Sequence, residues 1–230
     1  MFAGHIGAGL AIGSAERRVN VGLFVAAALL LDIALWVFVL AGRESVAMPS
    51  NFASTHQAEF VFPYSHGLLG GVVWSALAAS AAWAIFARLG TARLRLALLI
   101  AAAVFSHWLL DVLVHRPEMP LTGNTSPLMG LGLWNSMPVA LVAEGAIVML
   151  GLCMFIPHSG LPRGRSIAIA VLSLLVLAST VAGMTLAPPP PSGSVMAGSS
   201  LATLAAVCAL LAWLGRLPSD GQAHPGARPD

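Results

Sequence analysis

The chain has 230 residues, of which 58% are hydrophobic and 9% are charged, and its formal net charge is +2. Soluble domains carry about 25% charged residues, so this composition excludes an ordinary soluble protein and predicts a polytopic membrane protein. All 11 basic residues are arginine, and they form no basic stripe of the kind that binds nucleic acid.

The first stretch, residues 1–14, is apolar and rich in glycine but too short to cross a bilayer alone. We expect it to be a half-helix or a re-entrant segment packed against protein. Six later runs approach or exceed the roughly 20 apolar residues that a span requires. These runs are residues 19–41, 65–87, 96–114, 138–156, 166–187 and 195–214. The sequence therefore predicts an all-α transmembrane bundle.

This bundle is expected to form a single membrane domain over residues 1–217, followed by a disordered polar tail, residues 218–230. If the segment before Val19 is cytoplasmic, all arginines but Arg43 and Arg116 fall in inside segments. The bias predicts a cytoplasmic C-terminus and places the loop of residues 115–137 outside. Residues 157–217 contain no ionisable residue within their two spans, so we interpret those spans as scaffold and residues 1–156 as the part that carries a site.

The segment SHWLLDVLVH, residues 106–115, places His107 and Asp111 four residues apart in an apolar run. Residues four apart share one face of a helix, where an imidazole and a carboxylate can chelate a divalent metal. The two side chains could instead simply pair with each other across one turn. Which of these two interpretations holds depends on whether other helices supply further ligands.

Other ionisable residues fall at the same depth, in the outer half of the bundle. Asp32 and His66 belong to the first two spans, and His5 reaches mid-bilayer if its segment is helical, because 11 residues rise about 16 Å. No arginine or lysine within a span can neutralise Asp32 and Asp111, so a bound cation is the simplest partner. Mixed imidazole and carboxylate ligands favour zinc, one or two ions, with manganese or iron as alternatives.

Two further residues could carry chemistry beside such an ion. Glu144, in the fourth span, and His115 could act as a general base or as the acid that protonates a leaving group. Glu144 could instead pair with Arg116 or cap a polar cavity, and His115 could be an interfacial residue. The loop of residues 115–137 would be either a substrate-recognition lid or a plain interfacial loop anchored by Trp134.

The order of these motifs resembles a known family. An early His5, Asp32 at the end of LLLD, His66 in YSHGLLGG, and the SHWLLD segment resemble the YdjM-like family of bacterial membrane-bound metal-dependent hydrolases over roughly residues 1–156. That family is distantly similar to zinc-dependent phospholipases C and single-strand nucleases. The resemblance implies a bacterial inner-membrane protein with a shared set of metal ligands. These are His5, Asp32, His66, His107 and Asp111, with the last four around one ion and Asp111 bridging to a second that also uses His5.

The function expected on these grounds is a membrane-embedded hydrolase that cleaves an ester or phosphoester from the outer side. Its partners would be the bilayer and a lipid or small-molecule substrate, with no nucleic acid; the oligomeric state is not predicted. A cation- or proton-coupled transporter uses similar intramembrane residues and is one alternative. A metal-stabilised membrane protein without turnover is the other.

Overall fold

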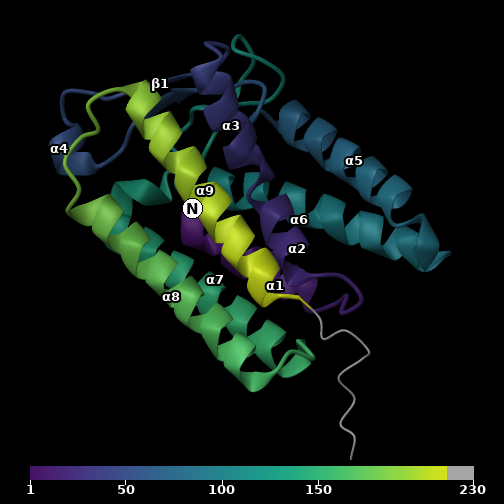
Figure 1. Ribbon diagram of the computed structural model, residues 1–230. Helices are drawn as coiled ribbons and strands as arrows, with labels where there is room; N and C mark the ends of the chain where they lie inside the picture. Colours follow the sequence, from purple (N-terminus) through teal and green to yellow (C-terminus); the bar gives the residue numbers. More distant parts are fainter. Residues whose placement is uncertain (217–230) are drawn as a thin grey trace, which may run out of the picture.

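The computed structural model describes residues 1–216, and the predicted disordered tail lies outside this range. The regular secondary structure of the described chain is almost all helical, as predicted (Figure 1). Its helices are α1 (Phe2–Gly13), α2 (Val21–Ala28), α3 (Leu30–Leu40), α4 (Phe52–Thr55), α5 (Leu68–Ile85), α6 (Ala92–Val114), α7 (Met137–Phe155), α8 (Arg163–Thr185) and α9 (Gly193–Leu214).

Five helices are long and apolar enough to cross a membrane: α5, α6, α8, α9, and α7 with its flanking turns (Leu133–His158). A sixth span results if α2 and α3 are taken together, which agrees with the six predicted runs. That first run is not one straight helix, however, because α2 and α3 meet at Leu29 with a bend of 50°. These lengths and hydropathies are compatible with an integral membrane protein.

The N-terminal segment is a helix that is enclosed by the bundle. The 12 residues of α1 contact α2, α6, α7 and α8, and most of them are buried. Glycines make these contacts close, since a Cβ atom on Gly7 would lie 2.6 Å from the carbonyl oxygen of Ile147 on α7. A Cβ on Gly9 would lie 2.8 Å from the Cα of Val25 on α2. The predicted half-helix is therefore packed against protein on all sides, as a segment too short to span requires.

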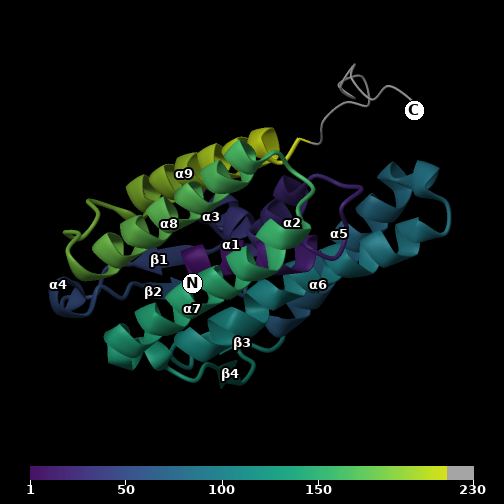
Figure 2. The ribbon, with the colours of Figure 1, turned by 90° about the horizontal axis from the view of Figure 1, so that it is seen from below.

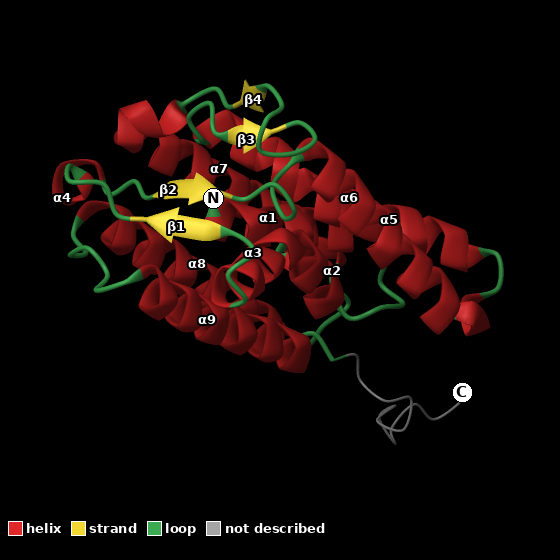
Figure 3. Cartoon of the chain, turned by 90° about the horizontal axis from the view of Figure 1, so that it is seen from above, coloured by secondary structure: helices red, strands yellow, loops and turns green. Residues whose placement is uncertain are grey.

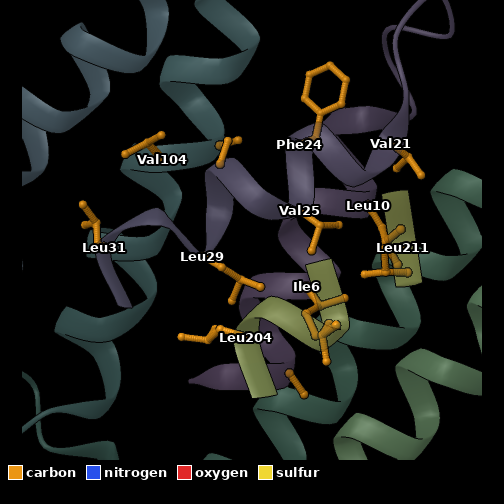
Figure 4. Packing of buried hydrophobic residues seen from close by; sticks show 14 of the residues in the cluster. Ile6, Leu10, Val21, Phe24, Val25, Leu29, Leu31, Val104, Leu204 and Leu211 are labelled. Atoms are coloured by element: carbon orange, nitrogen blue, oxygen red, sulfur yellow. The ribbon is translucent and has the colours of Figure 1, made fainter. Parts of the chain in front are cut away.

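Apolar side chains fix α1 between its neighbours. Ile6 and Leu10 lie among Val25 of α2 and Leu204 and Leu211 of α9 (Figure 4), and all five are buried. Burying a large aliphatic side chain is worth roughly 1.5–3 kcal/mol relative to water. The depth of α1 is thus set by packing on both sides, and this depth places His5 inside the bundle.

Two short antiparallel strand pairs order the long connections, which the sequence did not predict (Figure 3). In the first connection, β1 (Ser45–Ala47) pairs with β2 (Glu59–Val61). In the second, β3 (Met119–Pro120) pairs with β4 (Leu128–Met129). The side chain of Gln57 donates a hydrogen bond to the carbonyl of Trp134 at 2.8 Å, which ties the two connections together. Together they form a cap over one end of the helices.

The arginine-rich segments also contact other parts of the chain, away from the two strand pairs. Arg95 donates a hydrogen bond to the carbonyl of Ala15 at 2.6 Å, and Arg165 donates one to the carbonyl of Arg216. Each bond joins two segments that the charge distribution places on the inside. Glu16 accepts a hydrogen bond from Arg18 at 2.7 Å, which lowers the pKa of that carboxyl. These contacts place the two segments of each pair at the same end of the bundle.

Candidate metal centre

Five of the predicted residues meet at one place inside the bundle, although they come from distant parts of the chain. His5 lies on α1, and Asp32 lies in the first turn of α3. His66 lies in the turn that precedes α5, and His107 and Asp111 lie on α6. All of them are buried except Asp32, which is half-buried. The complete predicted ligand set is therefore brought together.

Asp111 occupies the centre of this group. Its Oδ2 atom lies 3.1 Å from Nε2 of His107 and 3.3 Å from Nε2 of His66. Its Oδ1 atom lies 3.1 Å from Nε2 of His5 and 3.1 Å from the nitrogen of Met1. Each carboxylate oxygen thus faces its own set of nitrogen atoms, which is the arrangement that a bridging carboxylate would need.

The atoms around Oδ2 include a triad of candidate ligands, His66, His107 and Asp111, whose ligand atoms lie within 4.8 Å of one another. The Nε2 atoms of His66 and His107 are 3.1 Å apart, and Oδ1 of Asp32 lies 3.7 Å from each of them. Zinc bonds of 2.0–2.1 Å in tetrahedral geometry place neighbouring ligand atoms about 3.3–3.4 Å apart. The separations of 3.1 and 3.3 Å among His66, His107 and Asp111 lie close to this value, so these three residues could hold one ion. His5, Asp32 and His107 form a second, overlapping triad, so the candidate ligands fall into two groups of three rather than one group of four.

The environment of His5 is the observation that most favours a bound metal ion. Its ring is fully buried and stacks on the ring of His107, with centroids 3.6 Å apart and planes 8° from parallel. Nδ1 has no hydrogen-bond partner among the described residues, and Nε2 meets only Oδ1 of Asp111, at 3.1 Å but outside the geometry of a hydrogen bond. A buried polar atom without a partner costs about 1–3 kcal/mol, and such atoms are rare in folded proteins. A metal ion would supply the missing partner.

The other ring nitrogens hold two of the imidazoles in position. Nδ1 of His107 lies 2.7 Å from the carbonyl oxygen of Ala28, the last residue of α2. Nδ1 of His66 lies 2.8 Å from Oγ of Ser65. A proton on each Nδ1 satisfies these contacts and leaves the Nε2 lone pairs directed at Asp111. Metal-ligating histidines are usually oriented in this way by a hydrogen bond from the second nitrogen.

The break at Leu29 explains the position of Asp32. Because α3 starts at Leu30, Asp32 falls in its first turn rather than in the middle of a continuous span. The first backbone N–H groups of a helix carry partial positive charge, which favours a carboxylate there. The bend therefore both directs Asp32 toward the two histidines and stabilises its charge.

Glu44 is a residue of this centre that the sequence did not reveal. It is buried in the connection after α3, where Oε1 accepts hydrogen bonds from the backbone N–H groups of Tyr64 and Ser65 at 2.8 Å. Oε2 accepts a bond of 2.7 Å from Oγ of Ser65. Burial raises the pKa of Glu44, and these hydrogen bonds oppose that rise. A chain of hydrogen bonds thus runs from Glu44 through Ser65 to His66.

We expect Glu44→Gln to lower metal affinity by about 10- to 100-fold, the usual effect of altering a group that orients a metal ligand. The new amide would donate to Ser65, whose hydroxyl would then donate to Nδ1 of His66 and place the imidazole proton on Nε2. Competition with a chromogenic chelator measures the affinity. Glu59→Gln, in exposed β2, is the matched control, and equal affinities in both variants would contradict the proposed orientation.

Glu144 lies on α7 close to the ligands. It is buried, and its Oε1 accepts a hydrogen bond of 3.1 Å from the backbone N–H of Gly4, in the first turn of α1. Among the residues described, Arg116 makes no ion pair with it, so the pairing considered from the sequence is not found. Its second oxygen remains available, and the side chain faces a cavity beside the centre.

His115 follows the last turn of α6 and stands one step further from the ligands. Its Nε2 lies 3.9 Å from Oδ2 of Asp111, and its Nδ1 lies 2.6 Å from Oε1 of Glu118. The ring packs against Trp134, with centroids 4.2 Å apart. Glu118 can therefore orient this imidazole, and Trp134 connects it to the loop of residues 115–137.

A cavity of about 390 Å³ adjoins the centre, within the usual range for small-molecule sites. Its polar side is formed by Asp32, His66, Asp111, His115 and Glu144. Aromatic side chains from both connections form much of the remaining wall, and Trp134 is among them, so the loop of residues 115–137 does more than anchor the protein at an interface. Residues of α8 and α9 also line the cavity. The two helices interpreted as scaffold thus contribute directly to the site.

Fold and site together define an all-α membrane bundle with a buried histidine–aspartate centre open to a cavity. Comparisons with protein-family models, curated proteins and solved structures found no match to this chain.

Proposed function

We propose that the protein is a membrane-embedded metal-dependent hydrolase that uses zinc to cleave an ester or phosphoester bond. The observation that carries the proposal is the buried ring of His5, beside four further ligand candidates. Its Nδ1 has no hydrogen-bond partner among the described residues, and its Nε2 faces Oδ1 of Asp111 without the geometry of a hydrogen bond. The adjoining cavity, with Glu144 in its wall, gives room for a substrate. The resemblance to the YdjM-like hydrolases points the same way and stays a prediction.

A bound zinc ion supplies positive charge and Lewis acidity to such a centre. The residues of the chain would then provide binding and proton transfer. The available oxygen of Glu144 is suited to accept a proton from water in the cavity, as a general base. His115, oriented by Glu118, is suited to donate a proton to the leaving group. The aromatic wall would exclude bulk water and so strengthen the electrostatic interactions within the site.

We further propose that the protein resides in a bacterial inner membrane with its C-terminus in the cytoplasm and its cavity toward the outer side. The uneven distribution of arginine among the connections supports this orientation. The contacts that join the arginine-rich segments are compatible with it.

Metal analysis of the purified protein tests the proposal, together with hydrolysis of nitrophenyl esters and phosphodiesters. We expect about one or two zinc ions per chain, bound at the mixed imidazole and carboxylate ligands. An Asp32→Ala/His107→Ala double variant should lose both metal and turnover, whereas Glu59→Ala should retain both. Full zinc occupancy in the double variant would contradict the site. Bound zinc without turnover would favour a structural role, and proton-coupled cation flux would favour a transporter.

A further inference from the structure

One wall of the cavity is formed by the last two helices, which carry none of the ligand candidates. The C-terminal part of α8 contributes Thr180, Gly183 and Met184, and the N-terminal part of α9 contributes Met196, Ser199 and Thr203. The start of α1 is visible between these helices in Figure 1, and Figure 2 shows both helices on one side of it. The space beside the metal centre thus extends to the outermost helices of the bundle.

This wall is mostly apolar, because three of its four hydroxyl groups are engaged within their own helices and only that of Ser200 has no hydrogen bond among the described residues. Thr180 donates its hydroxyl proton to the carbonyl of Val176 at 2.9 Å. Ser199 and Thr203 donate in the same way, each at 2.9 Å, to carbonyls four residues earlier in α9. These donors are satisfied within their own helices and are not needed by a bound molecule. The thioethers of Met184 and Met196 are flexible and adapt to irregular apolar ligands.

The same wall adjoins the outer surface of α8 and α9, the surface that would face lipid in a membrane. Val181 of α8 and Val195 of α9 are exposed, as expected of helix surfaces that face lipid. Gly183 lines the cavity and is nevertheless exposed, and a Cβ atom built on it would meet no atom within 4 Å. There is therefore free space at the point where the cavity meets the outer surface of the bundle.

We infer that α8 and α9 form a lateral access route and binding site for a hydrocarbon chain of a membrane lipid, whose polar head then lies beside Asp111 and Glu144. This inference rests on the proposed function and names its substrate class, an amphiphile with at least one long chain. Lipid tails are as apolar as leucine, so moving a chain from the bilayer to this wall changes little free energy. The wall accordingly selects and positions the substrate rather than adding much affinity.

Photocrosslinking tests the inference without requiring turnover. The full-length protein is reconstituted in phosphatidylcholine vesicles that contain a trace of phosphatidylglycerol with a diazirine in one acyl chain. We expect crosslinked peptides to be concentrated in residues 180–184 of α8 and 196–204 of α9. Gly183→Trp should reduce this labelling several-fold by filling the free space. Equal labelling of α5, whose exposed leucines and valines face lipid without a cavity, would show annular lipid only and overturn the inference.

Gly198→Trp is the matched control. Gly198 is an exposed helical glycine of α9 outside the cavity lining, and a Cβ atom there also meets nothing within 4 Å. This variant should retain the wild-type labelling pattern, and thermal unfolding checks that both variants fold. Labelling of the α8–α9 wall that persists after metal removal supports the inference even if hydrolysis fails. Hydrolysis of nitrophenyl substrates with no preferential labelling overturns the inference and leaves the proposed function intact.

Discussion

Asp111→Asn is expected to release the bound metal and to lower hydrolysis by at least about 10³-fold, since a catalytic metal supplies several kcal/mol of transition-state stabilisation. The two oxygens of Asp111 face different nitrogens: Oδ1 faces His5, and Oδ2 faces His66 and His107. An asparagine keeps the size of the side chain but removes its charge and replaces one acceptor with a donor. This single variant should therefore lose metal binding both on the Oδ1 side, at His5, and on the Oδ2 side, at His66 and His107.

Asp32→Asn provides the informative comparison for this result. Oδ1 of Asp32 lies 3.7 Å from His66 and 3.7 Å from His107, and the exposed part of its side chain opens toward the cavity. Its loss should weaken metal binding without abolishing it, because Asp111 still connects the remaining ligands. Mass spectrometry of the intact protein and metal analysis measure occupancy in both variants. If Asp111→Asn bound metal as the wild type does, the centre described here would be wrong.

Glu144→Gln is expected to lower the turnover number by about 10²- to 10⁴-fold, the usual contribution of a general base, while metal content stays unchanged. Glutamine can still accept the hydrogen bond from the N–H of Gly4, so α1 should keep its position. It cannot take a proton from water. Steady-state kinetics on a nitrophenyl substrate, with metal analysis of the same sample, separates the chemical effect from a loss of metal.

Glu118→Gln serves as the control at the other proton-transfer position. Glu118 contacts only His115 within the candidate site and is not itself buried, so its replacement should change turnover much less than Glu144→Gln. A Glu144→Gln variant that is fully active would remove Glu144 from the mechanism and leave His115 as the remaining candidate base. A variant that loses its metal would show instead that Glu144 supports the ligands.

The ligands were accessible from the sequence because intramembrane charge is rare and helix spacing is regular. His107 and Asp111 could be paired from their four-residue separation, and their depth matched that of His66. The five-residue set was then proposed from family resemblance and charge balance, and these residues do converge in space. The all-α architecture could also be predicted, because the apolar runs have the length of membrane-spanning helices.

The residues that tertiary contacts alone define could not be found in this way. Glu44 acts through Ser65, and nothing in the segment around it distinguishes it from an ordinary interfacial acid. The break at Leu29 has no glycine or proline to mark it, so residues 19–41 resemble one continuous span. The contribution of α8 and α9 to the cavity was missed for a related reason, because small and hydroxyl residues at helical spacing are typical of helix packing as well as of a binding wall.

The enclosed position of α1 has a consequence for how the protein is made. Gly4 bonds to a residue 140 positions later in the chain, and Gly7 fits against the backbone of that same helix, α7. During synthesis α1 can pack against α2 and α6 first, but its contacts with α7 form only once that helix has been inserted. The helix that carries His5 therefore gains its full set of contacts only after most of the bundle exists, although His107 and Asp111 on α6 are inserted earlier. A metal ion that needs His5 as a ligand would then bind fully only to chains in which α1 has reached its final position.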